Sequence, residues 1–325
     1  MSKSSSKTFA RVMHDLANEK YPPAKDDLHQ LSDLSSDQLK EFKSLWSHVP
    51  APRRRTIMTA LGEYAEENFE LDIKAVSRAA LTDSDGLVRA AATHNLWEDE
   101  GHDLIATFLT LLVNDPQVEA RVAAATALGQ YVYLGEMEEL DESLMHKIEE
   151  ALLAVFNGDD DPEVRRHALE SIGFSGRKEV VTAIQKGYAD PADLFKISAL
   201  FAMGRNLDYR WDYIVLHELQ NVNPRIRFEA ARAAGELQLP DAVKALGELV
   251  GDVDVEVQEM AIWALGEIGG EEAREILDTL LKHAKGERAE LIDEALANAE
   301  LLDDIAGFDL MDADDLEDEM KRRLN

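Results

Sequence analysis

The sequence predicts an all-α protein, an α-solenoid (superhelix) of about seven stacked helix pairs. Three observations predict this fold: a pattern recurs with an offset of 31 residues, each copy holds two short amphipathic segments, and proline follows aspartate or asparagine in several turns. Two copies are plain in residues 223–270, where a polar residue stands eight positions before a glycine. We call this polar residue the ladder position. Along the chain it is held by Arg54, Arg89, Arg121, Arg165, Lys196, Arg227 and Gln258.

Each copy reads as two helices that cannot be stable alone. Spacings of four, four and three place four apolar residues on one helix face: Val257, Ala261, Leu265 and Ile268. Residues 241–250 form a shorter helix before it. Helices of about three turns are marginal in water, so both must bury their apolar faces against neighbouring copies. The alanines and the glycine of the second helix allow close approach, or suit a helix end.

Four turns carry a polar residue followed by proline. A side-chain oxygen before a proline at the first helical position is typical of a helix N-terminus. We therefore expect four residues to cap the second helices of their repeats: Asp115, Asp161, Asp190 and Asn223.

The cleanest copy, DPEVRRHALESIG in residues 161–173, resembles the HEAT-repeat family, especially the short HEAT-like repeats of phycobilin lyase subunits. The resemblance covers roughly residues 37–300. In such repeats the recurring arginine and the turn aspartate hydrogen-bond between neighbouring units. The resemblance therefore implies a structural inter-repeat role for Arg54, Arg89, Arg121, Arg165 and Arg227. Lys196 and Gln258 depart from the pattern and should form weaker links.

The chain divides by pattern into three segments. Residues 1–36 form an N-terminal lead with a capping helix, residues 37–302 form the HEAT-like array, and residues 303–325 form an acidic tail. The array includes a longer unit with an insertion near residues 130–145, which we expect to be a longer helix or a packed loop. The acidic tail with its interspersed apolar residues is either a solvated end or a segment that folds on a partner.

Composition and charge limit the function. The chain has no cysteine, which excludes a disulfide framework and thiol chemistry. Its net charge is −31, with +3 in residues 1–62 and −34 in the rest, so general nucleic-acid binding is not expected. The only tight basic cluster is Arg53, Arg54 and Arg55, which we interpret as one ladder arginine with two solvated neighbours. No apolar run is long enough to span a bilayer. We expect a soluble, cytoplasmic protein that does not bind membranes.

Catalytic motifs are sparse. HEAT-like iron hydroxylases use repeated adjacent His-Glu pairs on facing helices, and here only His217-Glu218 is such a pair. His94 and Glu98 could share a helix face, but no matching pair lies in another repeat. Neither a phosphate-binding loop nor a nucleophile elbow occurs. We therefore expect no metal, no cofactor and no enzymatic activity. A HEAT-type enzyme or phycobilin-lyase-like subunit remains the alternative, and a DNA-lesion binder is disfavoured by charge.

One column of the repeat is expected to line the inner wall of the solenoid. It lies five residues after the ladder position and holds Thr59, His94, Thr126, Glu170, Phe201, Arg232 and Trp263. Aromatic rings beside arginines are typical of interaction hot spots. The candidate partner-binding residues are Arg166, His167, Phe201, Arg205, Phe228, Arg232, Met260 and Trp263.

These residues favour a protein–protein interaction scaffold that binds a peptide or protein segment in this groove. An acidic segment would complement the arginines, and the chain's own acidic tail is one candidate. The alternative is that the aromatic rings only fill gaps between alanine-rich helices.

Overall fold

The computed structural model describes residues 7–158 and 160–302. The chain separates into two compact units, Met1–Ser175 and Gly176–Asn325, which are described one at a time. All regular structure within the described residues is helical. None of these helices is long and apolar enough to cross a bilayer. The expected cytoplasmic location stays a prediction.

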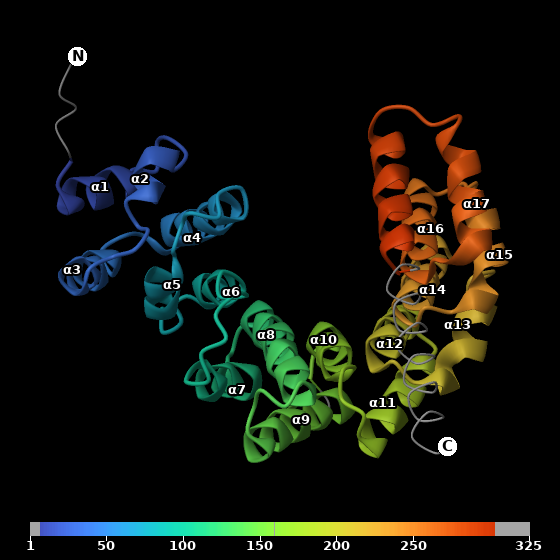
Figure 1. Cartoon of the computed structure of the whole chain (residues 1–325). Coiled ribbons are helices and arrows are strands. Elements are labelled where there is room, and N and C mark those ends of the chain that lie inside the picture. The colour runs from blue at the N-terminus through green and yellow to red at the C-terminus, as the bar shows by residue number, and fades with distance from the viewer. Residues whose placement is uncertain (1–6, 159, 303–325) are drawn as a thin grey trace, which may run out of the picture. The chain divides into compact units, whose positions relative to one another are not determined.

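The first unit contains two short N-terminal helices followed by four helix pairs (Figure 1). The second helices of the pairs, α4, α6, α8 and α10, pack on one another in order. The elements are α1 (Phe9–Leu16), α2 (Lys25–His29), α3 (Ser36–Trp46), α4 (Ala51–Glu66), α5 (Lys74–Ala80), α6 (Gly86–His94), α7 (Leu104–Asn114), α8 (Val118–Glu136), α9 (Glu142–Asn157) and α10 (Pro162–Ile172).

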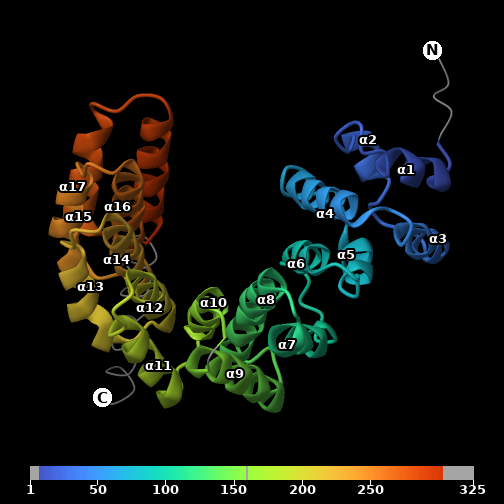
Figure 2. The ribbon, with the colours of Figure 1, turned by 180° about the vertical axis from the view of Figure 1, so that it is seen from behind.

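The second unit continues the same arrangement (Figure 2). Its second helices, α12, α14 and α16, pack in order, while α11, α13 and α15 each contact the second helix of their own pair. The elements are α11 (Lys178–Tyr188), α12 (Asp193–Asn206), η1 (Tyr209–Trp211), α13 (Asp212–Glu218), α14 (Pro224–Glu236), η2 (Pro240–Ala242), α15 (Val243–Leu249), α16 (Val255–Ile268) and α17 (Gly270–Leu281). A last helix spans residues 287–302.

The predicted fold is confirmed: the chain is an all-α, HEAT-like solenoid with the seven expected pairs, α3/α4 through α15/α16. Beyond these, α17 and the helix of residues 287–302 form a further pair, where we expected only a closing helix. Arg288 ties this last helix to the array, because its guanidinium donates to the carbonyl oxygen of Val250 at 2.9 Å. The predicted bounds of the repeat array stay a prediction.

Close packing of the second helices depends on their small residues. Ala261 and Leu265 are fully buried, as the repeat frame requires. A Cβ atom added to Gly235 of α14 would lie 2.7 Å from a ring carbon of Trp263 and 3.0 Å from the Cα of Ala264. The glycine of the repeat therefore permits a close helix crossing, which was one of its two expected roles.

The N-terminal helix and the insertion, both in the first unit, can be compared with what the sequence predicts for them. The apolar face of α1 is covered, since Val12, Met13 and Leu16 are at most 2% exposed. The insertion extends α8 to Glu136, so the longer-helix interpretation is confirmed. The acidic tail, residues 303–325, lies outside the described residues.

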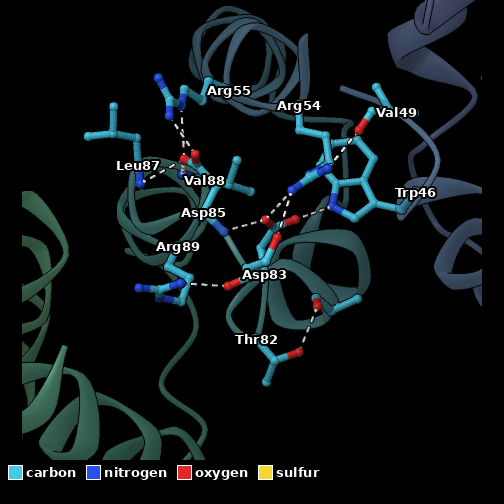
Figure 3. Close-up of polar contacts among 12 residues, drawn as sticks. Trp46, Val49, Arg54, Arg55, Thr82, Asp83, Asp85, Leu87, Val88 and Arg89 are labelled. Atoms are coloured by element: carbon cyan, nitrogen blue, oxygen red, sulfur yellow. Dashed lines mark hydrogen bonds and ion pairs between the residues drawn. The ribbon is translucent and has the colours of Figure 1, made fainter. Parts of the chain in front are cut away.

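Arginine–aspartate rungs link successive repeats at the ladder position (Figure 3). Arg54 of α4 donates to Asp83 of the next repeat at 2.8 Å and to the Val49 carbonyl oxygen of its own turn at 2.6 Å. Arg89 of α6 then donates to the Asp83 carbonyl oxygen at 2.6 Å. The turn at Asp83 therefore receives one guanidinium from its own repeat and one from the repeat before it.

The same geometry continues along both units. Arg89 and Arg227 bind the next aspartates, Asp115 and Asp252, through paired hydrogen bonds of 2.6 to 2.7 Å. Arg121 binds Asp160 at 2.7 Å. Arg165 donates to the Phe156 carbonyl oxygen at 3.0 Å within its own repeat.

The two departures from arginine form sparser links. Lys196 lies 3.4 Å from the carboxylate of Glu218, through a single nitrogen. Gln258 donates to the carbonyl oxygen of Asp252 at 2.5 Å. Neither side chain reproduces the paired bonds of an arginine, because each lacks the planar fork of donors.

Two of the four predicted helix N-caps are confirmed, and the other two are wrong. Asp161 and Asn223 cap α10 and α14, each with proline at the first helical position. Asp115 and Asp190 do not cap, because α8 and α12 begin three residues after them. The two observed caps stand four residues before the ladder position, whereas Asp115 and Asp190 stand six before it, and an Asp-Pro pair occurs at either place.

The basic cluster on α4 is not one ladder arginine with solvated neighbours. Arg53 is 5% exposed and donates to the carbonyl oxygens of Leu16 and Tyr21 at 2.5 and 3.0 Å. Arg55 forms two hydrogen bonds with Asp85 (Figure 3). The three arginines therefore tie α4 to the N-terminal segment, to its own turn and to the next repeat.

Candidate functional site

Six of the eight predicted partner-binding residues lie in the second unit, on α12, α14 and α16. Three of them meet. The Arg232 guanidinium lies 3.9 Å from the centre of the Phe201 ring, and Arg205 lies 5.3 Å from the same ring. Trp263 is half-buried beside Gly235.

The positive charge of this cluster is compensated within the chain. Arg232 is 9% exposed and pairs with Glu229 at 2.8 Å and Glu236 at 2.5 Å. Arg205 also approaches Glu236, at 3.3 Å. An acidic ligand would therefore compete with carboxylates already in place, and partner binding by these residues stays a prediction.

The other two residues of this set lie apart from the arginines. Phe228 lines a pocket of about 200 Å³ together with Ile197 and Val257. Met260 is half-buried on α16.

A larger groove lies in the first unit, across three successive second helices. It has a volume of about 660 Å³, within the range of small-molecule and peptide side-chain sites. We call it the α8 groove, because α8 supplies its apolar floor with Val118, Val122, Ala123 and Ala127. Its sides come from α6 with Thr93 and His94, from α10 with Glu163 and His167, and from Trp97.

A second, smaller pocket adjoins the α8 groove and shares His94 and Trp97 with it. It has a volume of about 280 Å³ and lies beside the segment that joins α4 to α5. We call it the side pocket. Besides the two shared residues, its lining includes Glu66, Phe69, Glu70, Asp72, Lys74 and Glu98. The two cavities therefore adjoin at His94 and Trp97 within the first unit.

Trp97 stands where the two cavities meet because α6 ends at His94. Its repeat carries tryptophan in place of the glycine, and the indole is 59% exposed. Asn95, two residues before it, donates to the Met58 carbonyl oxygen at 3.0 Å, and so fills the space beside Gly62. The turn of this repeat therefore presents an aromatic ring to solvent.

The loop after Trp97 is fixed by buried polar contacts. The guanidinium of Arg78 donates two hydrogen bonds, of 2.6 and 2.7 Å, to the carboxylate of Asp99. The Tyr131 hydroxyl reaches the carbonyl oxygens of Asp99 and Gly101 at 3.1 and 3.0 Å. The Arg78 hydrogen bonds also hold the pKa of Asp99 below its ordinary value, so this anchor is ionised at neutral pH. Trp97 is thus carried by a fixed loop.

Of the two predicted residues on α10, His167 lines the α8 groove and Arg166 does not. Arg166 pairs with Glu163 and Glu170, each at 2.7 Å. His167 lies 3.3 Å from the Thr126 hydroxyl. Burial lowers the pKa of His167. The negative charge of Glu170 raises this pKa and the positive charge of Arg166 lowers it, so burial decides the outcome and the imidazole is neutral near pH 7. His167 is the only predicted partner-binding residue that lines this groove.

The surface formed by the two cavities is acidic and aromatic. Six carboxylate residues line it against one lysine, Lys74. Phe69 is 91% exposed beside the exposed Trp97. Glu70 and Glu98 form no ion pair with any residue that the structure describes. Such a surface favours a ligand with cationic and apolar groups.

An iron centre of the hydroxylase kind does not fit the residues described. His217 is exposed and stacks on Tyr213, whereas Glu218 is 2% exposed. The Glu218 carboxylate is occupied by Tyr188 at 2.5 Å and by Asn221 at 2.5 Å. Across residues 7–158 and 160–302, no three His, Cys, Asp or Glu side chains gather as metal ligands.

Repeated helix pairs joined by arginine–aspartate rungs define a helical-repeat architecture. A family model of HEAT repeats matches residues 105–204 and 214–297, more than half of the sequence. The chain belongs to the HEAT-repeat family.

Relatives of known identity are similar to parts of the chain. A deoxyhypusine hydroxylase from Drosophila pseudoobscura pseudoobscura is 31% identical over 122 residues, which are 37% of this chain and 40% of the relative. The matched region is thus less than half of that enzyme's length. Two solved structures are more distant. The CpcE–CpcF complex of phycocyanin lyase from Nostoc sp. PCC7120 has 19% identity and a TM-score of 0.48, covering 70% of this chain and 94% of that chain. Human deoxyhypusine hydroxylase has 17% identity and a TM-score of 0.34, covering 80% and 95%.

Our expectation that the protein is not an enzyme is corrected by these comparisons. The sequence relative is named as a hydroxylase, so the similarity points toward an enzyme family. The expectation rested on the scarcity of His-Glu pairs. That scarcity argues only against one kind of iron centre and not against catalysis in general.

Proposed function

We propose that this HEAT-repeat protein recognises a segment of another protein in the α8 groove. The observation that carries the proposal is the exposed indole of Trp97 between two adjoining cavities of about 660 and 280 Å³. An extended segment fills such a concave surface better than a compact small molecule does. An aromatic ring carried by a fixed loop at the junction of the cavities provides the anchor that interfaces use as a hot spot.

The charge of the groove supports a partner different from the acidic segment expected from the sequence. Carboxylates outnumber cations along both cavities, so an acidic segment, including residues 303–325 of this chain, would be repelled. The arginine-bearing cluster of Phe201 and Trp263 remains the competing location for a partner.

A selection from a phage-displayed library of random dodecapeptides, using the full chain as target, tests the proposal. The enriched peptides should lose affinity for the variants Trp97→Ala and Val122→Asp. The double variant Phe201→Ala, Trp263→Ala is the matched control and should bind them as the unchanged protein does. Retained binding by both groove variants, or loss only in the double variant, contradicts the proposal. Circular dichroism confirms that each variant is folded.

A catalytic role is the second candidate, and the 31% identical stretch of a deoxyhypusine hydroxylase favours it. The segment held in the groove would then be the substrate of a covalent modification. A selected peptide is incubated with the full chain in a cell extract that supplies co-reactants, and its mass is measured before and after. A mass gain of one oxygen atom that disappears with Trp97→Ala supports hydroxylation. An unchanged mass contradicts it.

A further inference from the structure

The side pocket differs in chemistry from the α8 groove that it adjoins. The floor of the α8 groove is aliphatic, whereas the side pocket combines two exposed aromatic rings with four carboxylate residues and one lysine. The rings are those of Phe69 and Trp97, and they belong to different repeats. A ligand that lies across Trp97 therefore meets an apolar surface on one side and an anionic, aromatic surface on the other.

We infer that the side pocket takes an arginine side chain of the bound segment. A guanidinium stacks on aromatic faces and donates to carboxylates in the same plane, and it loses its hydration more readily than an ammonium group. Phe69 and Trp97 supply the faces, and Glu70 and Glu98 supply carboxylates that no described residue pairs with. This inference rests on the proposed function, because it names the residue that the segment must carry.

The aliphatic floor of the α8 groove indicates which kind of side chain the ligand carries beside the arginine. Val118 and Val122 offer no hydrogen bonds, so the side chain beside the arginine is apolar. The recognised segment thus pairs an apolar residue with an arginine, separated by the indole of Trp97.

Designed peptides test the inference without knowledge of the natural partner. Blocked peptides with one leucine and one arginine, separated by one, two or three alanines, are titrated into the full chain by calorimetry. Versions with citrulline, which keeps the shape of arginine without its charge, and with lysine are compared. The best arginine peptide should bind about tenfold tighter than its citrulline version, and the lysine version should fall between them.

The double variant Glu70→Gln, Glu98→Gln should abolish the preference for arginine over citrulline. Glu41→Gln with Glu142→Gln is the matched control, since it removes the same charge from exposed positions of the same unit outside both cavities. The control should keep the preference. Its loss in the control would assign the effect to the general field of the protein and overturn the inference.

The outcomes separate this inference from the proposed function. Equal binding of arginine and citrulline peptides, with affinity still lost in Trp97→Ala, overturns the arginine assignment and leaves groove recognition intact. Equal binding of lysine and arginine also overturns it. Absence of any Trp97-dependent binding, among designed and selected peptides alike, overturns both.

Discussion

Arg89 donates two hydrogen bonds to the carboxylate of Asp115, each 2.6 Å long, although the two residues belong to successive repeats. Their side chains are only 13% and 2% exposed. The same guanidinium also donates to the carbonyl oxygen of Asp83 in its own turn. One side chain thereby fixes both the shape of a turn and its distance from the next, which is the nearest-neighbour coupling that repeat proteins depend on.

Replacing Arg89 with methionine should therefore destabilise the first unit strongly. The variant leaves Asp115 buried without its counter-charge, which costs about 3 kcal/mol in the free energy of unfolding. Urea denaturation measures it. Lys40→Ala is the control, because Lys40 forms an exposed pair with Asp37 and should change stability by less than about 0.5 kcal/mol. A variant Arg89→Met as stable as the control contradicts the structural role of the rung.

The rungs and arginine clamps also predict acid sensitivity. Hydrogen bonds from Arg55, Arg78 and Arg227 hold the pKa of Asp85, Asp99 and Asp252, respectively, below the ordinary aspartate value. The unfolded chain therefore takes up protons at higher pH than the folded chain does. This stabilisation is complete above the ordinary aspartate pKa and is lost as pH falls below about 4. The urea midpoint should drop between pH 7 and pH 3.5.

The variant Asp252→Asn isolates one of these groups. It should be less stable at pH 7 and should lose less stability than the unchanged protein on acidification, because one titrating carboxylate has been removed. An identical pH dependence in both proteins would show that this aspartate does not contribute.

The variant Gly235→Ala has two opposing effects on stability, a gain in helix propensity and a loss from overpacking. Alanine in place of glycine gains about 1 kcal/mol within a helix, but its Cβ would lie 3.0 Å from the backbone of Ala264 and 2.7 Å from Trp263. Overpacking of this kind costs about 1–3 kcal/mol, so we expect a net loss of stability. Gly251→Ala is the control, since its nearest new contact is 3.6 Å away. Stabilisation by Gly235→Ala would contradict the close crossing of α14 and α16.

Trp97→Ala should leave the fold intact. The indole is largely exposed, and surface substitutions away from buried networks change stability by about 0.5 kcal/mol. Thermal denaturation beside the unchanged protein checks this. A large fall in melting temperature would mean that Trp97 supports the fold, and a loss of binding in this variant could not then be assigned to the groove.

Tyr131→Phe should loosen the loop that carries Trp97. The variant removes the single O–H that lies within hydrogen-bond distance of the carbonyl oxygens of Asp99 and Gly101, and its loss costs about 1 kcal/mol. Hydrogen exchange should accelerate in residues 95–103, and groove peptides should bind more weakly. Tyr133→Phe is the control, since that ring is 44% exposed and packs edge-on against Phe174. Unchanged exchange in Tyr131→Phe would contradict the anchoring.

The repeat frame was predictable because its signals are local. Spacing alone located the helix pairs and the arginine of each rung. It misplaced two caps, since Asp115 and Asp190 look like Asp161 in sequence but stand two positions farther from the ladder residue of their repeat. Which aspartate meets a guanidinium from the repeat before it depends on how the repeats stack, and no single repeat contains that information.

The groove was less predictable for a physical reason. The sequence placed His94 and Thr126 in the column that faces the inner wall, and it gave His167 as a candidate partner-binding residue. It did not indicate that α6 ends at His94 and turns the indole outward beside Phe69. Conversely, Arg205 and Arg232 read as free positive charge, because their pairing with Glu236 appears only when α12 and α14 are packed together.

The contacts that hold the loop after α6 come from Arg78 and Tyr131, and the indole of Trp97 takes part in none of them. A substitution at position 97 should therefore leave the loop in place. A single codon change there would alter the side chain that the groove presents to a ligand, with little effect on folding.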